Sequence, residues 1–154
     1  MCIYTAMHLL SDYAQGNQDT IQLLSTSAVF IIPAVNYDSL VAISDQYSAL
    51  GTLNYQRKNR NTSTAQTKSC NSSDLFGVDL TRNYDFKYGL DEVGSTSQIC
   101  SDSYRGPSAF SEPETQAIRS LLERRRNIKI AFNYHAYGNY LNIPNNYDDA
   151  TNTA

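Results

Sequence analysis

The sequence predicts an α/β fold, because segments with helical and strand-like patterns alternate along its 154 residues. Residues 2–15 repeat apolar side chains every three or four positions, which indicates an amphipathic helix. Residues 28–35, AVFIIPAV, form an almost unbroken apolar run, which is typical of a strand covered on both faces. A second amphipathic helix follows the motif SEPE at residues 111–114. Together these patterns favour a sheet that helices cover.

In the N-terminal half, the first predicted helix ends near Gly16. Residues 19–24 predict a short second turn of helix, and Pro33 removes one backbone donor near the end of the first strand. Residues 36–76 are rich in Asn, Ser, Thr and Tyr without a clear period, so we expect a long loop. The buried face of the first helix is expected to consist of Ile3, Ala6, Met7, Leu10 and Tyr13.

In the C-terminal half, residues 77–82 predict a short strand and a helix begins at Ser111. Ser111 and Glu114 have the spacing of a capping box, in which each side chain bonds the backbone amide of the other residue. The positive charges of 124–126 suit the last turn of that helix. Residues 128–134 alternate and predict another strand. The buried stripe of the helix is expected to contain Ala117, Ile118, Leu121 and Leu122.

Composition and charge exclude some classes of function. The chain is 41% hydrophobic and 18% charged, and its formal net charge of −3 gives no support to nucleic acid as a partner. Its apolar runs fall well short of the roughly 20 residues of a membrane span, so we expect none. The first residues lack the basic segment of a signal peptide.

Two motifs carry a resemblance to a known family. The stretch CSDSYRGPSAFSEPET at 100–115 and the stretch NYHAYGN at 133–139 resemble zinc carboxypeptidases of the A/B type. The resemblance covers residues 1–144, the expected central part of a longer catalytic domain, and leaves 145–154 as a loose polar tail. It implies an incomplete, mixed and mostly parallel twisted sheet with helices on both faces. It also implies a hydrolase that removes C-terminal residues from peptides and proteins.

The resemblance implies zinc as cofactor and His135 as one of its ligands. The family's other two ligands form a His-x-x-Glu pair, which the sequence does not contain, because His8 is followed by Ser11 at the third position. We read His8 as a position on the first amphipathic helix. The family's catalytic Glu also lies outside the region of resemblance. The chain is therefore expected to be inactive alone.

The resemblance also assigns residues that contact substrate. In VDLTRNYD, Arg82 would bind the substrate's terminal carboxylate through its planar fork, and Thr81 replaces the family's Asn. In NYQRKNRN, Arg57 would stabilise the oxyanion formed during peptide hydrolysis. Asn83 and Tyr137 would line the neighbouring subsites. The alternatives are a structural or salt-bridging role for Arg82, a solvated basic loop around Arg57 and an ordinary half-buried aromatic at Tyr137.

The cysteines bear on the compartment. Cys70 and Cys100 occupy positions that are bridged in several secreted members of the family, and two reduced thiols are the alternative. The sequence also has sequons at 61–63 and 71–73, which are usable if the chain is secreted. We therefore expect an extracellular or secretory-pathway protein.

Two functions of different classes remain open. The chain is either a fragment of an active zinc metallocarboxypeptidase or a non-catalytic secreted interaction domain derived from that fold. The first predicts a peptide or protein C-terminus as the substrate. The absence of a His-x-x-Glu pair and the presence of Thr81 favour the second for the chain alone, whereas the intact motifs favour the first.

Overall fold

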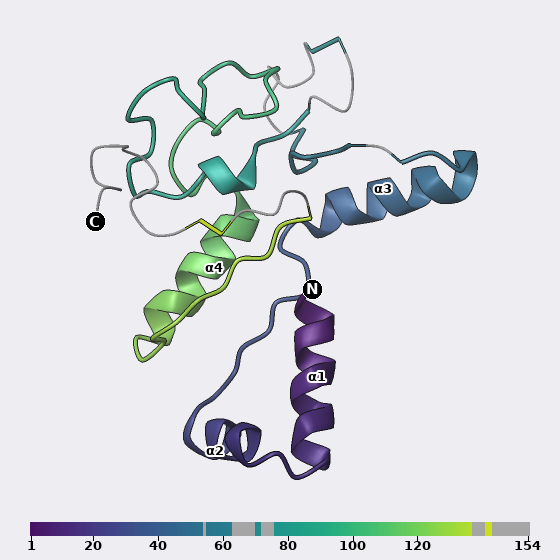
Figure 1. Cartoon of the computed structure of the whole chain (residues 1–154). Helices are drawn as coiled ribbons and strands as arrows, with labels where there is room; N and C mark the ends of the chain where they lie inside the picture. Colours follow the sequence, from purple (N-terminus) through teal and green to yellow (C-terminus); the bar gives the residue numbers. More distant parts are fainter. Residues whose placement is uncertain (54, 63–69, 72–75, 137–140, 143–154) are drawn as a thin grey trace. The chain divides into compact units, whose positions relative to one another are not determined.

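The computed structural model describes residues 1–53, 55–62, 70–71, 76–136 and 141–142 (Figure 1). The chain divides into two compact units, one built from Met1–Ala34 with the described residues from Ile130 onward, and the other from Val35–Lys129. The elements, in chain order, are α1 (Cys2–Ala14), α2 (Gln18–Thr26), α3 (Tyr37–Leu50), the 3-10 helix η3 (Leu80–Arg82) and α4 (Pro113–Arg124).

The first unit contains the helix pair α1 and α2, which confirms the two helices predicted there. The Asn17 side chain caps α2 by accepting a hydrogen bond from the Thr20 amide at 3.1 Å. The apolar stripe of α1 is largely exposed, with Met7 at 65% and Leu10 at 67%, so the prediction of a buried stripe is wrong for this unit. None of the helices in the described ranges combines the length and apolar character that a lipid bilayer demands.

The two longer predicted strands are not observed. Residues 28–35 and 128–134 run as irregular chain, and the described residues contain no strand, so the predicted sheet is not confirmed. A strand is stable only when another strand satisfies its backbone groups. The apolar run at 28–35 stays accessible, and Phe30 is 48% exposed.

The third predicted strand, 77–82, is replaced in part by η3. The Asp79 carboxylate accepts a hydrogen bond from the Thr81 amide at 3.0 Å, which caps this single turn. Short polar side chains compete in this way with the backbone pairing of a strand. The described residues contain one parallel bridge, between Thr96 and Tyr104.

Helix α3 falls inside the region that the composition predicted to be a loop, so that prediction is wrong for its first third. The helix ends at Gly51, whose φ of 66° lies in the left-handed region that glycine adopts without strain. The signal that reveals α3 is a helical spacing of Leu40, Ile43, Tyr47 and Leu50 among many polar residues.

The centre of the second unit is mostly polar. Three segments, 56–59, 77–83 and 104–115, are joined by backbone bonds, including Asn59 N–H to Val78 at 2.9 Å and Asp79 N–H to Tyr104 at 2.8 Å. The described residues bury few large apolar side chains here, so hydrogen bonding must supply much of the specificity. The most deeply buried polar side chains are Lys58, Asn59, Asp79, Asn83, Glu112 and Thr115.

Helix α4 confirms the predicted helix after SEPE but not its capping box. Glu112 occupies the N-cap position and Pro113 follows it, so Ser111 lies one residue too early to cap. The Ser111 hydroxyl instead donates to the Glu112 carboxylate at 2.7 Å, and Glu114 accepts from Asn59 at 3.3 Å. The buried residue of this helix is Thr115, whereas Ala117 and Leu122 of the predicted stripe are exposed.

Candidate functional site

Three of the residues predicted to handle substrate lie together in the second unit. Thr81 and Arg82 belong to η3, and Arg57 comes from the neighbouring segment 56–59. The Thr81 hydroxyl oxygen accepts hydrogen bonds from Nη2 of Arg57 and from Nη1 of Arg82, both at 3.1 Å. Two guanidinium groups therefore meet at one oxygen atom.

The Asp79 carboxylate orients Arg57 and Thr81. Its side chain is 1% exposed and accepts from Nε of Arg57 at 2.9 Å and from the Thr81 hydroxyl at 2.7 Å. A carboxylate can only accept, so the Thr81 proton points to Asp79 and the Thr81 oxygen receives the two arginines. One carboxylate against two guanidinium groups leaves the cluster with an excess positive charge.

The arginines keep donors outside this network. The bonds described for Arg57 use Nε and Nη2, and the Arg57 side chain is 43% exposed. Those of Arg82 use Nε, which donates to the Gly94 carbonyl at 2.6 Å, and Nη1. The second Nη of each group takes no part in these bonds. A planar guanidinium with one edge held by protein and another edge outside those bonds is suited to binding an anion.

Asn83 lies in a buried network of hydrogen bonds. Its side chain is fully buried at 0% exposure, so its contacts are structural, and a substrate role for it stays a prediction. The amide ties the end of η3 to the loop before α4 and to the first turn of α4. It donates to the carbonyls of Arg105 and Ser108 and to the Ser111 hydroxyl, and it accepts from the Glu112 amide and the Thr115 hydroxyl.

The histidines lie in the first unit. His135 is exposed and follows the irregular segment that was predicted as a strand. His8 lies on α1 with its Nδ1 3.1 Å from a carboxylate oxygen of Asp12, four residues along the same helix, as expected of an ordinary helix position. Tyr137 falls outside the described residues.

The described residues do not by themselves fit a zinc ion. Tight zinc sites use three or four protein ligands, and no group of three His, Cys, Asp or Glu side chains in the described ranges could hold a metal. His135 offers a single imidazole. We therefore assign no chemical step to a metal in this chain.

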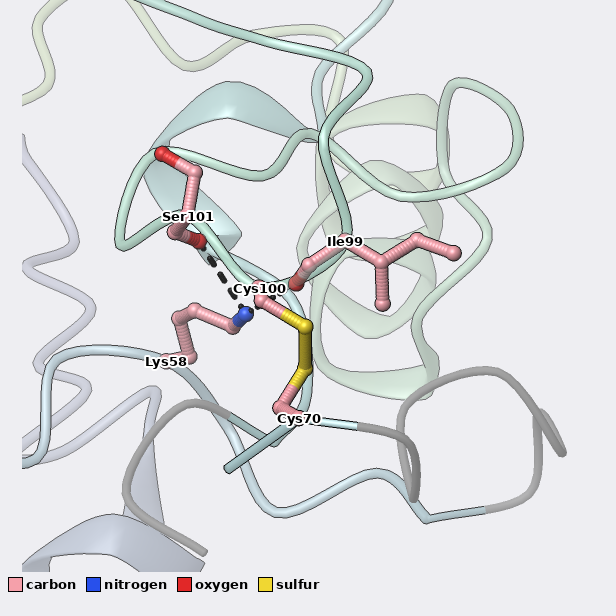
Figure 2. The surroundings of a disulfide bond; sticks show 5 residues. All are labelled: Lys58, Cys70, Ile99, Cys100 and Ser101. Carbon is pink, nitrogen blue, oxygen red and sulfur yellow. Dashed lines mark hydrogen bonds between the residues drawn. A yellow bond between two sulfur atoms is a disulfide. The ribbon is translucent and has the colours of Figure 1, made fainter. Parts of the chain in front are cut away.

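Cys70 and Cys100 form a disulfide with their Cα atoms 5.4 Å apart. Beside it lies Lys58, which the sequence analysis did not single out. Figure 2 shows the Lys58 ammonium group directed at the backbone on both sides of Cys100. Its Nζ donates to the carbonyls of Ile99 at 2.7 Å and Ser101 at 3.1 Å.

A second buried group that sequence reasoning missed is the Glu112 carboxylate. It is 1% exposed and accepts from the side-chain amides of Asn59 at 2.8 Å and Asn61 at 2.7 Å, as well as from Ser111. These donors compensate the cost of burying its charge. The network fixes segment 56–61, which carries Arg57, against the start of α4.

Comparison with known proteins now adds to this geometry. The model of the zinc carboxypeptidase family matches residues 1–154. Carboxypeptidase A2 of Mus musculus is 33% identical over 145 residues, which are 94% of this chain and 31% of that relative. Carboxypeptidase A5 of Homo sapiens is 34% identical over 143 residues, which are 92% of this chain and 29% of that relative.

Among solved structures, carboxypeptidase A from Helicoverpa armigera is 37% identical and has a TM-score of 0.48, covering 63% of this chain and 20% of that one. This chain spans about a third of the length of the curated relatives that it matches. Because the family model extends over the whole sequence, the chain belongs to the zinc carboxypeptidase family.

Proposed function

We propose that this chain supplies the substrate-anion site of a zinc metallocarboxypeptidase, a protease that removes C-terminal residues from peptides and proteins. The observation that supports the proposal is the convergence of Arg57 and Arg82 on the Thr81 hydroxyl. These are the residues that the family motifs predict to contact substrate. A C-terminal carboxylate is the anion that distinguishes the substrate of such an enzyme from an internal peptide bond.

The two arginines have separate roles in this proposal. Arg82 binds the terminal carboxylate through the guanidinium edge outside its bonds to Gly94 and Thr81. Arg57, held in orientation by the buried Asp79, stabilises the negative charge that develops on the scissile carbonyl oxygen. No residue of this chain is assigned the proton transfer, so the chain alone is proposed to bind substrate without hydrolysing it.

Further features of the proposal rest on the family and on the motifs. His135 is proposed as one ligand of the family's zinc ion, and Tyr137 and Asn83 as residues near the neighbouring subsites. We propose that residues 1–144 are the central part of a catalytic domain with a mixed, mostly parallel sheet and helices on both faces, in which segments 28–35 and 128–134 are strands. The disulfide supports an extracellular or secretory-pathway location, because such bonds persist in oxidising compartments.

A second candidate is a non-catalytic interaction domain. The exposed apolar stripe of α1, with Ile3 at 62% and Met7 at 65%, favours it, because such a face commonly marks a contact surface. This candidate predicts binding that does not depend on a free carboxylate. A comparison of binding between a peptide with a free carboxylate and its C-terminal amide therefore separates the two candidates.

The test is a titration of the 154-residue chain with acetyl-pentaalanine bearing either a free carboxylate or a C-terminal amide, followed by NMR of the arginine Nε–H groups. We expect the free acid to shift the signals of Arg57 and Arg82 and the amide to leave them in place. Arg82→Ala should lower the affinity for the free-acid peptide by about tenfold to a hundredfold, as expected for a lost charge-assisted bond.

The control is Arg126→Ala, which removes an exposed arginine outside the cluster and should leave both affinities unchanged. Equal affinity for the acid and the amide, or equal loss of both with Arg82→Ala, would contradict the proposed carboxylate site. A failure of the free-acid peptide to bind would contradict it as well.

A further inference from the structure

Lys58 is a buried cation that the proposed function does not use. Its side chain is 0% exposed, although lysine is among the residues least often buried completely. A buried ammonium group is stable only where acceptors replace its water. The carbonyls of Ile99 and Ser101 are two such acceptors, and the ring of Tyr104 lies 5.5 Å from Nζ.

The two carbonyls have a special position in the chain, because they flank Cys100. One belongs to the residue before the cysteine and the other to the residue after it, and both converge on a single nitrogen atom (Figure 2). One side chain thus holds the peptide unit before Cys100 and the peptide unit after Ser101. Cys70 forms the disulfide with Cys100.

The backbone of Lys58 is itself held in place. Its carbonyl accepts from the Ser39 hydroxyl of α3 and from the Gln56 side-chain amide, the latter at 3.0 Å. Burial lowers the pKa of the Lys58 ammonium, while the carboxylates of Asp102 and Asp79 act to raise it. The backbone of Lys58 is therefore fixed where its side chain begins. We call the two bonds from Lys58 Nζ to the carbonyls of Ile99 and Ser101 the lysine clamp.

We propose that Lys58 is a positioning residue for the Cys70–Cys100 disulfide, in which the lysine clamp and the covalent bridge stabilise each other. The clamp joins segment 56–59 to the residues around Cys100, and the bridge joins the nearby Cys70 to the same place. Once one link is closed, the loop that the second must close is shorter, so its entropic cost is lower. By linkage, each link must strengthen the other by the same factor.

The redox step in this proposal is an ordinary exchange with a small dithiol. Dithiothreitol gives two electrons and two protons to the bridge, which becomes two thiols, and is itself oxidised to a cyclic disulfide. If the proposal holds, this reduction also releases the Lys58 amine from its carbonyl partners.

The first experiment uses the wild-type chain and an amine-acetylating reagent, with mass spectrometry to quantify each lysine. In the oxidised chain, Lys58 should react at least tenfold more slowly than the exposed Lys129. After reduction by dithiothreitol, Lys58 should approach the rate of Lys129. Hydrogen exchange at the Phe110 amide, which bonds the Asn83 carbonyl at 2.6 Å, reports whether the rest of the unit stays folded.

Three outcomes would overturn the proposal in this experiment. Lys58 could react as fast as Lys129 in the oxidised chain, or stay protected after reduction. The Phe110 amide could also lose its protection together with Lys58, which would mean that reduction opens the whole unit and not a local clamp.

The second experiment measures the equilibrium between the chain and dithiothreitol for Lys58→Met and for the matched variant Lys129→Met. Lys58→Met should lower the equilibrium constant for disulfide formation by about tenfold or more, because two charge-assisted bonds are lost. Lys129→Met should leave it within about twofold of wild type. Equal constants for the two variants would refute the clamp, and if Lys58→Met does not fold, the labelling experiment decides alone.

Discussion

Replacing Asn83 by Ala should destabilise the second unit more than any loss of a single surface contact. The side chain of Asn83 is fully buried and bonds five groups of the loop 105–111 and the start of α4. Truncation removes one hydrogen bond from each of these groups, while the Ser108 carbonyl and the Ser111 and Thr115 hydroxyls keep a second partner. Each buried orphan costs about 1–3 kcal/mol, and partial rearrangement reduces the sum, so we expect a loss of about 3–5 kcal/mol.

The assay is urea unfolding followed by near-ultraviolet circular dichroism of tyrosine, because Tyr84, Tyr88 and Tyr104 lie in the unit that Asn83 ties together. The matched control is Asn127→Ala, an exposed position after α4, where we expect a change within about 0.5 kcal/mol. A loss below about 1 kcal/mol for Asn83→Ala would refute the reasoning. It would show that the bonds of the Asn83 amide are easily replaced and would return a substrate role to consideration.

Three other perturbations test separate contacts. Gly77→Ala should cost more than about 3 kcal/mol by urea unfolding, because φ is 91° and a Cβ would lie 1.8 Å from the Asn59 carbonyl oxygen. Hydrogen bonds, the largest from the Ser97 amide, lower the pKa of Glu92 to about 2. The stability that Glu92 confers should therefore be lost as the pH falls from about 4.5 to about 2. Glu92→Gln should remove this part of the pH dependence of the free energy of unfolding. Reduction of the disulfide should weaken binding of the free-acid peptide, followed through the Arg57 signal in the same NMR titration, and an unchanged affinity would contradict this expectation.

The helices that could be predicted are those whose apolar residues recur with the period of a helix turn. This holds for α1 and for α4, which the motif SEPE also indicated, whereas α2 was predicted only as a short turn of helix at residues 19–24. The same period is present in α3, but Asn, Ser and Tyr around it favoured a loop in the composition. Local pattern alone does not decide whether a strand forms, because a strand depends on hydrogen bonds to a partner that is often distant in sequence.

The candidate site divides in the same way between what motifs reveal and what only packing shows. Arg57, Thr81 and Arg82 were predicted from their motif contexts, and the structure brings them together. The burial of Asn83 and Lys58 was not predictable, since Asn and Lys are usually exposed and only their acceptors distinguish the buried cases. Thr81 stands where the family motif has Asn, and its proton points to Asp79.

The segment 56–59 explains why the site and the disulfide are physically connected. Gln56 and Lys58 are buried while Arg57 between them is exposed, so successive side chains point in opposite directions, as they do along any extended chain. The inward Lys58 bonds the backbone around Cys100, and the outward Arg57 bonds Asp79 and Thr81. Because all of these residues are polar, hydrophobicity does not reveal that buried and exposed side chains alternate here. The alternation places Lys58 at the disulfide and its neighbour Arg57 at the anion site. The residue that holds the backbone around Cys100 and the residue that belongs to the anion site are therefore direct neighbours in the chain.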